Sequence, residues 1–373
     1  MKKSFIPAAL ILTVCLCLTM ALAAGGDASD PLVSLAYLRD FFSKSVDESV
    51  TSRLNEADSQ LREDLQQQLD TMTAAVEAAT GQNFAPAATE AMLKEGDVLT
   101  GPTGLTVVPL AGSIRLDTDT GSVVDVSNGQ TVAPGTVLSP QHRYIVAEGT
   151  VARFTVTSPV AALTYEGNYA FSLSQNTPDY YAIAQALREL TLFRGTGTGY
   201  AQGFDLHLAP TRGQGLVMFI RILGEEQAAL SCSFRHPFND VPDWLDPYVA
   251  WAYQQGYSNG ISATQFGTDL PIKAFEYEEF LLRALGYSVA GVHDYTTSLE
   301  RALEYGALTN GEYTLLTEGQ FLRAQVAYTS YYSLDMILSG SQITLAQRLL
   351  DSGVFSYQQL IAARSAANSF RLP

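Results

Sequence analysis

The spacing of apolar residues changes twice along the chain. Over residues 30–81 apolar residues recur at every third or fourth position among acidic and amide side chains, which predicts one long amphipathic helix. Over residues 96–173 the spacing becomes two, and Gly-containing turns separate short runs of β-branched and aromatic residues. Helical spacing then returns and continues to the C-terminus. The pattern therefore predicts a multidomain α+β protein.

The N-terminal helical segment carries a single apolar stripe. A lone helix cannot bury such a stripe, so the helix needs another copy of itself, another protein or a later part of its own chain as a partner. Successive steps of four drift from a strict heptad, which disfavours a regular left-handed coiled coil. An oligomeric coiled coil and a helix docked on its own protein both remain open. The stripe consists of Leu35, Leu38, Phe42, Val46, Val50, Leu54, Ala57, Leu61, Leu65, Leu69, Met72 and Val76.

The middle region predicts a small all-β domain. Short strands at this spacing are typical of an antiparallel sandwich or barrel. The expected strands are residues 106–108, 113–116, 123–126, 144–146, 152–156 and 162–165.

The C-terminal half contains three related units, at residues 179–226, 236–288 and 292–335. Each reads as a helix, a turn containing glycine or asparagine, and a second helix, and the third is the most degenerate. Units of this kind cover one another's apolar faces in a repeat array. Residues 339–373 have another helical pattern and are expected to cap the array.

The central unit carries the clearest motifs. Phe238-Asn239-Asp240-Val241 is followed by Trp244, the pair Gly256 and Gly260, Phe266, and Leu282-Arg283-Ala284-Leu285-Gly286. In these residues the C-terminal half resembles the S-layer homology domain, a module usually found in threes on bacterial surface proteins. The resemblance implies a non-enzymatic wall anchor that binds acidic, often pyruvylated, secondary cell-wall polysaccharide in grooves between its units.

In that family a Thr-Arg-Ala-Glu motif opens the last helix of each unit. Here Thr211-Arg212-Gly213-Gln214 keeps the Thr and Arg, Ile272-Lys273-Ala274 keeps a basic residue, and Leu322-Arg323-Ala324-Gln325 keeps Arg-Ala. The resemblance therefore implies polysaccharide-binding roles for Thr211, Arg212, Gln214, Lys273 and Arg323.

The residues support an anion site independently of the resemblance. Arg212, Lys273 and Arg323 each stand at an expected helix start, where free backbone N–H groups and the helix dipole already favour an anion. Trp251 is added as an aromatic face that could stack on a sugar. The alternative is that the three cations pair with nearby acids such as Asp205, Asp269 and Glu318, and that Trp251 belongs to the core.

Composition and the N-terminus suggest the compartment. Lys2 and Lys3 precede an apolar run that ends in Ala21-Leu22-Ala23, so residues 1–24 are expected to be a cleaved signal peptide, after which no membrane segment is expected. Only Cys232 lies outside that run, which excludes an intramolecular disulfide and a multi-cysteine metal site in the exported chain. The net charge of −16 argues against nucleic acid as a partner.

The sequence lacks several motifs of common catalytic sites. HExxH, paired CxxC and a complete phosphate-binding loop are all missing, and no cofactor or metal is expected. We therefore expect a non-enzymatic protein of the bacterial cell surface, with a possible homo-oligomer through the N-terminal helix. The alternatives are a self-assembling surface protein whose repeats only pack, and a wall-active hydrolase.

Overall fold

The computed structural model describes residues 42–80, 83–195, 200, 203–289, 292–367 and 370–373. The chain separates into two units, Met1–Ala75 and Val76–Pro373. The expected signal peptide and the first part of the expected N-terminal helix lie outside the described residues. None of the described helices is both long enough and apolar enough to cross a membrane.

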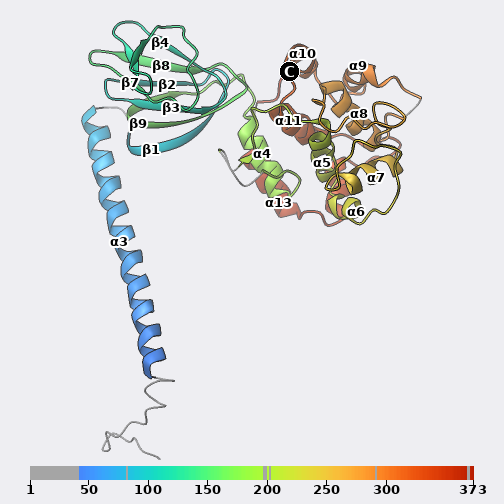
Figure 1. Cartoon of the computed structure of the whole chain (residues 1–373), viewed down its shortest axis with the longest axis horizontal. Helices are drawn as coiled ribbons and strands as arrows, with labels where there is room; N and C mark the ends of the chain where they lie inside the picture. Colours follow the sequence, from blue (N-terminus) through green and yellow to red (C-terminus); the bar gives the residue numbers. More distant parts are fainter. Residues whose placement is uncertain (1–41, 81–82, 196–199, 201–202, 290–291, 368–369) are drawn as a thin grey trace, which may run out of the picture. The chain divides into compact units, whose positions relative to one another are not determined.

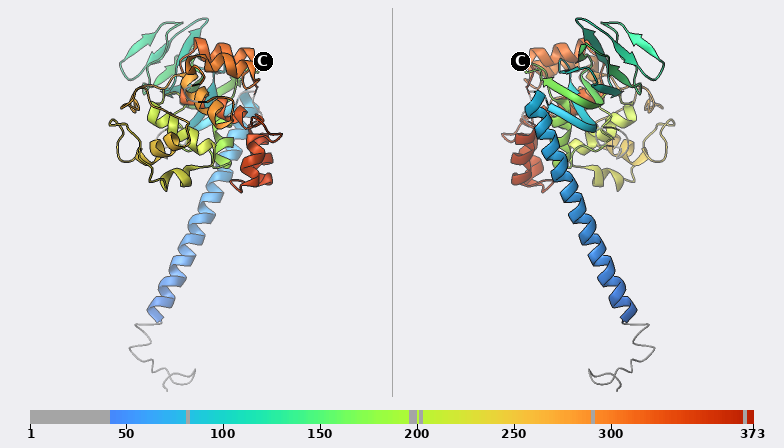
Figure 2. Two further views of the ribbon diagram at one scale, coloured as in Figure 1. Left: turned by 90° about the vertical axis from the view of Figure 1, so that its right-hand side faces the viewer. Right: turned by 90° about the vertical axis from the view of Figure 1, so that its left-hand side faces the viewer.

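The N-terminal helix α3 covers Ser43–Thr80. Figures 1 and 2 show it as one unbroken helix. The periodicity predicted this helix, and the structure confirms it over the described residues. The large apolar side chains from Phe42 to Met72 are all exposed.

The middle of the chain forms an antiparallel sheet that curls into an almost closed barrel (Figure 1). Its strand order is β4-β8-β2-β9-β3-β7-β5-β6, and β1 also pairs with β9. The strands are β1 (Asn83–Lys94), β2 (Val98–Pro102), β3 (Thr106–Ala111), β4 (Ile114–Thr118), β5 (Val123–Asp125), β6 (Gln130–Val132), β7 (Tyr144–Val146), β8 (Val151–Val156) and β9 (Val160–Ser172).

The long strand β9 closes most of the barrel. Its first part pairs with β1 and β3, and its last residues pair with β2. The segment after β6 then returns to β4, where Leu116 N donates to Thr136 O (2.9 Å) and Leu138 N donates to Ile114 O (2.8 Å). Alternate residues of β8 point into the core, so Phe154 is buried while its neighbours Arg153 and Thr155 are partly exposed.

All six predicted β runs lie at strands of this barrel, but the barrel begins earlier than the sequence suggested. Strand β1 starts at Asn83, whereas we expected the β domain to start at residue 96. Its sequence, NFAPAATEAMLK, is rich in Ala, Met, Glu and Lys, which favour helices. Pairing with β9 along most of its length outweighs that local preference.

The C-terminal part is helical and agrees with the predicted spacing. Two helices were missed, α6 and α10, because α6 is short and because Asn310-Gly311 suggested a turn. The elements are α4 (Tyr180–Glu189), α5 (Arg212–Ile222), α6 (Glu226–Leu230), α7 (Asp246–Gln254), α8 (Ala274–Ala284), η3 (Tyr295–Thr297), α9 (Ser298–Glu304), α10 (Asn310–Glu318), α11 (Arg323–Ser333), α12 (Leu345–Asp351) and α13 (Tyr357–Ala366).

Three helices form the centre of this part. Helices α5, α8 and α11 contact one another, and each packs against one outer helix: α7 on α5, α9 on α8, and α4 on α11. Each outer helix therefore packs on a central helix other than the one that follows it in the sequence. Helix α13 packs against α4, so the C-terminal tail contacts the helical part.

Two glycines of the barrel allow a matched test of its packing. Gly112 has φ +77°, and a Cβ added there would lie 2.2 Å from Val160 O in β9. Gly135 has φ +84° with open space around it. We expect Gly135→Ala to cost about 1 kcal/mol for its left-handed backbone. Gly112→Ala should cost about 2 kcal/mol more because the methyl group collides with β9.

Hydrogen exchange of peptides from β3, β4 and β9, followed by mass spectrometry, measures both losses of local stability. Equal losses in the two variants would contradict the tight contact at Gly112.

Candidate anion-binding site

The three central helices start in the same way. In each, the side chain of the third helical residue accepts a hydrogen bond from the backbone N–H of the N-cap residue, which satisfies a donor that the helix itself leaves free. The pairs are Thr211 N to Gln214 Oε1 (3.2 Å), Lys273 N to Glu276 Oε2 (2.9 Å) and Leu322 N to Gln325 Oε1 (2.9 Å).

This shared cap shows that the sequence analysis placed Lys273 at the wrong position relative to Arg212 and Arg323. Arg212 and Arg323 are the first residues of α5 and α11, but Lys273 is the N-cap of α8 and Ala274 takes the first helical position. Lys273 therefore corresponds to Thr211 and not to Arg212. The three cations do not occupy one equivalent place.

The starts of α5 and α11 are hydrogen-bonded to distant loops. Arg212 N donates to Leu270 O (2.7 Å) and Gly213 N donates to Thr268 O (3.0 Å). At α11, Arg323 N donates to Leu208 O (2.9 Å) in the same manner. Each of these arginines thus lies at a seam between two segments that are far apart in sequence.

Arg212 is buried at its seam, with 6% of its surface exposed. Its Nη1 donates to Glu276 Oε1 (2.8 Å), and its guanidinium lies over the rings of Phe266 and Phe280. Burial lowers the pKa of Arg212, and the charge of Glu276 opposes that shift. Among the described residues, no acceptor bonds its buried Nε atom. Arg212 therefore has one unused donor.

A hollow of about 220 Å³ opens beside Arg212. It lies between the start of α5, the loop before α8, helix α8 itself and the segment leading into η3. Its polar lining is Arg212, Asn259, Glu276, Glu279, Arg283 and His293, and its apolar lining includes Ile261, Phe280 and Tyr295.

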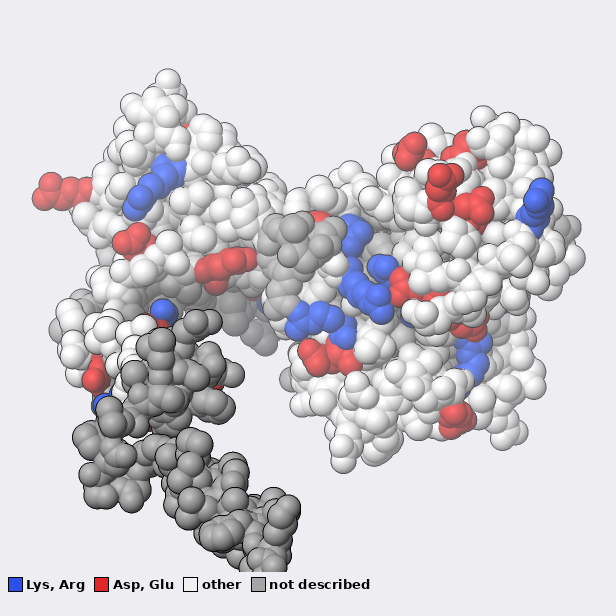
Figure 3. Space-filling view, turned by 60° about the horizontal axis from the view of Figure 1, so that its bottom comes forward, with Lys and Arg blue, Asp and Glu red and all other residues white. Residues whose placement is uncertain are grey.

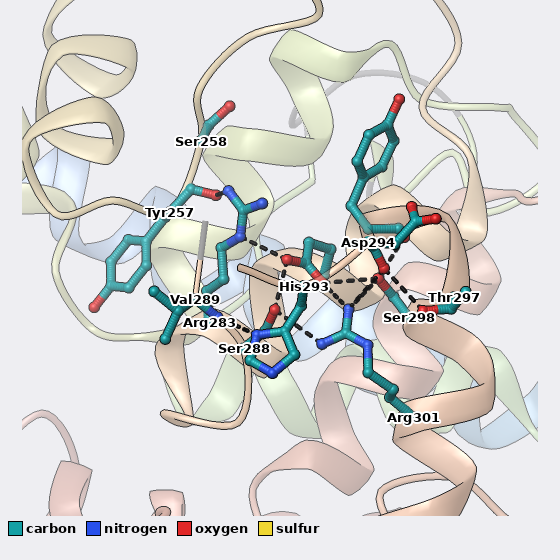
Figure 4. Close-up of polar contacts among 12 residues, drawn as sticks. Tyr257, Ser258, Arg283, Ser288, Val289, His293, Asp294, Thr297, Ser298 and Arg301 are labelled. Atoms are coloured by element: carbon teal, nitrogen blue, oxygen red, sulfur yellow. Dashed lines mark hydrogen bonds and ion pairs between the residues drawn. The ribbon is translucent and has the colours of Figure 1, made fainter. Parts of the chain in front are cut away.

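A network of hydrogen bonds surrounds buried Glu279, which lines the hollow together with Arg283. Figure 4 shows the donors of this network, Arg283, Ser288, Ser298 and Arg301. Glu279 accepts hydrogen bonds from Arg283 Nε (2.7 Å), Arg301 Nη2 (2.6 Å), Ser288 Oγ (2.7 Å) and Ser298 Oγ (2.7 Å). Burial alone would raise the pKa of Glu279, but these four donors outweigh it and lower the pKa. The network holds Arg283 in place with its Nη1 on Tyr257 O (3.1 Å).

The other predicted site residues lie elsewhere. Arg323 is buried, and its guanidinium donates to Phe204 O (2.8 Å) and lies over the ring of Phe193. Lys273 is exposed and lines a separate hollow of about 470 Å³ with Phe275. Trp251 is 5% exposed and packs against Tyr257, away from the lining of the Arg212 hollow. Arg212 lines the hollow, whereas Lys273, Arg323 and Trp251 do not.

Thr211 and Gln214 have structural roles at the start of α5. Thr211 Oγ1 accepts from Gln214 N (3.3 Å), while Gln214 Oε1 accepts from Thr211 N. Their polar groups are used to cap the helix, and neither residue lines the Arg212 hollow.

Sequence reasoning missed most of the residues around Arg212. Glu276 could have been found as the capping acid three positions after Lys273, and Glu279 as a carboxylate four positions before Arg283. Asn259 and His293 carried no such signal. Their place depends on which segments become neighbours in the fold.

The charged side chains that line the hollow balance one another. Arg212 and Arg283 oppose Glu276 and Glu279, and Arg301 pairs with Glu279 from outside the lining. On the face drawn in Figure 3, basic side chains over the helical part lie next to acidic ones, so that face has no uninterrupted cationic surface. Within the described residues, His, Cys, Asp and Glu side chains do not gather in groups that could hold a metal ion.

Comparisons with known proteins leave the family open. No family model and no curated protein matches this chain. Among solved structures it is similar to NovW, a 4-keto-6-deoxy sugar epimerase from Streptomyces spheroides, with 21% identity over 27% of this chain and 53% of that chain. It is also similar to the rmlC epimerase of Mycobacterium tuberculosis, with 19% identity over 28% of this chain and 54% of that chain.

A third similar structure is procruciferin, an 11S globulin from Brassica napus, with 13% identity over 27% of this chain and 26% of that chain. The TM-score is 0.16 for each of the three. The chain spans about half the length of the two epimerases that it matches. Similarity at this level assigns neither a fold nor an activity.

Glu278 and Glu279 provide a matched pair for testing the network. Glu279→Gln should destabilise the helical part by about 3 kcal/mol at pH 7, because it leaves Arg283 and Arg301, whose side chains are 10% and 11% exposed, without their counter-charge. Since the pKa of Glu279 is lowered on folding, this stabilisation is present above the carboxyl's ordinary pKa and is lost as the pH falls through the lowered value. The difference in stability between the Glu279→Gln variant and the native chain should therefore become smaller at acid pH.

Glu278 should behave in the opposite way. Burial raises its pKa to about 8, and the charge of Glu312 adds to that shift. The native helical part should therefore lose stability as the pH rises from about 5 to 9. Glu278→Gln should remove this loss and melt at a higher temperature than the native chain at pH 9.

Thermal melting followed by tryptophan fluorescence reports both effects, because Trp244 and Trp251 lie in the helical part. The same pH profile for both variants would contradict the two assignments.

Proposed function

We propose that the protein is a non-enzymatic bacterial surface protein held to the cell wall by its C-terminal helical part. In this proposal the helical part is an array of three S-layer homology-like units, and its ligand is an acidic secondary cell-wall polysaccharide. The protein reaches the surface after its signal peptide is removed. The hollow at Arg212 accepts a carboxylate carried by one sugar of the polymer.

The packing of the helical part supports an array of three units. Each central helix is covered by the outer helix of a different unit: α7 covers α5, α9 covers α8, and α4 covers α11. The last of these contacts returns from the third unit to the first. Three units whose faces are completed only by their neighbours are what a closed repeat array requires.

The observation that carries the ligand assignment is the state of Arg212. Arg212 lines the hollow and its buried Nε atom has no partner among the described residues, so a turn of its side chain toward the hollow would let the guanidinium donate to a carboxylate. The hollow of about 220 Å³ is smaller than a usual drug-sized site. It therefore suits a single acidic sugar and not a long oligosaccharide.

The overall charge of the chain makes a local site necessary. With 22 basic and 38 acidic residues, the protein as a whole repels a polyanion. Attraction must come from a few cations in a confined hollow, where the electrostatic interaction is stronger than at an open surface.

A sedimentation assay with purified cell walls tests the proposal on the full chain. Retention should be high on intact walls and lost on walls from which the acidic polysaccharide has been extracted. Arg212→Lys keeps the charge but removes the planar fork, so retention should weaken by about tenfold, as expected for the loss of one charged hydrogen bond.

Arg364→Lys is the matched control. Arg364 lies in α13, is about half exposed and pairs with Asp335. This variant should be retained as the native chain is. Equal retention on intact and extracted walls would overturn the proposed ligand, and unchanged retention of Arg212→Lys would overturn the proposed site.

A further inference from the structure

Helix α3 carries an apolar stripe that the described residues of its own unit do not cover. Its large members are between 39% and 69% exposed. Together they leave on the order of 900 Å² of side-chain surface in water, close to the ~800 Å² that each partner buries in a stable interface. The stripe consists of Phe42, Val46, Val50, Leu54, Ala57, Leu61, Leu65, Leu69 and Met72.

The spacing within the stripe is regular over a longer period than a heptad. The steps from Phe42 are four, four, four and three, and the same order then repeats from Ala57 to Met72. The repeat is therefore 15 residues in four turns, since 57 − 42 and 72 − 57 both equal 15, which gives 15/4 = 3.75 residues per turn. A heptad gives 3.5, below the 3.6 of a straight helix, whereas this repeat lies above it.

A period above 3.6 determines the hand of the supercoil. The stripe drifts around the helix in the direction opposite to that of a heptad, so two such helices remain in contact only if they wind right-handed. A partner must also carry apolar residues at the same long period, or the contact is lost after a few turns. A second copy of α3 meets this condition because it has the same sequence.

The charges beside the stripe favour a parallel arrangement. Asp58 and Arg62 each follow a stripe residue and lie on one flank, while Arg53 and Asp64 each precede one and lie on the other. In a parallel pair in register, one flank faces the other flank of the second copy. Asp58 then opposes Arg53 of the second copy, in addition to its pair with Arg62 in its own helix (2.8 Å).

We infer that α3 assembles with a second copy of itself as a parallel, in-register, right-handed coiled coil. The surface involved belongs to the N-terminal unit and uses no residue of the Arg212 hollow. Assembly is therefore independent of wall binding, and either can fail without the other.

The mass of the full chain, measured by light scattering over a range of concentrations, tests assembly. The native chain should form a discrete oligomer of at least two copies. Leu61→Glu with Leu65→Glu places charges in the stripe and should give the monomer. Ser59→Glu with Gln67→Glu adds the same two charges on the opposite side of the helix and should leave the oligomer intact.

Unchanged tryptophan fluorescence would show that both double variants keep the helical part folded. A native chain that is monomeric at all concentrations would overturn the inference. So would equal dissociation of the stripe variant and its back-face control.

Two insertions test the 15-residue period. Duplicating residues 57–71 adds one full repeat and keeps the stripe in phase, so the oligomer should be at least as stable as the native one. Duplicating residues 57–63 adds seven residues and turns the stripe by about 48° in the 15-residue geometry. This insertion should weaken assembly by at least about tenfold, which corresponds to 1.4 kcal/mol. The reverse order would identify a left-handed heptad coil and overturn the inference.

Cysteine cross-linking tests direction, in a chain whose three native cysteines are replaced by serine. Val50→Cys alone and Leu69→Cys alone should each give disulfide-linked dimers under mild oxidation if the helices are parallel and in register. Dimers that form only when the two variants are mixed would show an antiparallel pair and contradict the inferred arrangement.

Discussion

The helical part depends on hydrogen bonds that join the starts of its central helices to loops from other segments. Arg212 N and Gly213 N donate to carbonyls of the loop at 268–270, and Arg323 N donates to Leu208 O. The first N–H groups of a helix have no partner inside it, so a buried helix start must find acceptors elsewhere. Because these acceptors lie in distant segments, the starts of α5 and α11 are completed only when those segments pack against them. The helical part must therefore fold together.

The same seams explain why positively charged side chains are buried here. A charge at a buried helix start is costly unless it is paired, and the three central helices differ in how their starts avoid this cost. At α11 a backbone carbonyl and an aromatic ring enclose Arg323. At α8 the first position is Ala274, so no charge needs to be paired. Only at α5 does the arginine combine a carboxylate partner, an unused donor and an adjoining hollow.

The sequence predicted those features that depend on local pattern. Periodicity located α3, most strands of the barrel and all three central helices, because burial of one face imposes that spacing. It missed β1, whose composition favours a helix and whose strand conformation comes from pairing with β9. It found Arg212 from a motif but not the pairs of Arg212 with Glu276 and of Arg301 with Glu279, which span 64 and 22 residues. Such contacts arise only from the packing of whole segments.

Assembly through α3 bears on the proposed wall binding, because linked sites bind a polymer more tightly than separate ones. In the proposed function, a hollow of about 220 Å³ with few hydrogen-bond donors would take one sugar residue with modest affinity. A repeating polymer, however, presents the same group many times. Joining two chains through α3 makes the second contact intramolecular, and this can strengthen attachment by about 10² to 10⁴ without any new contact. Under the two proposals together, an acidic protein with a small hollow of this kind is held on an acidic wall more firmly than by one site alone.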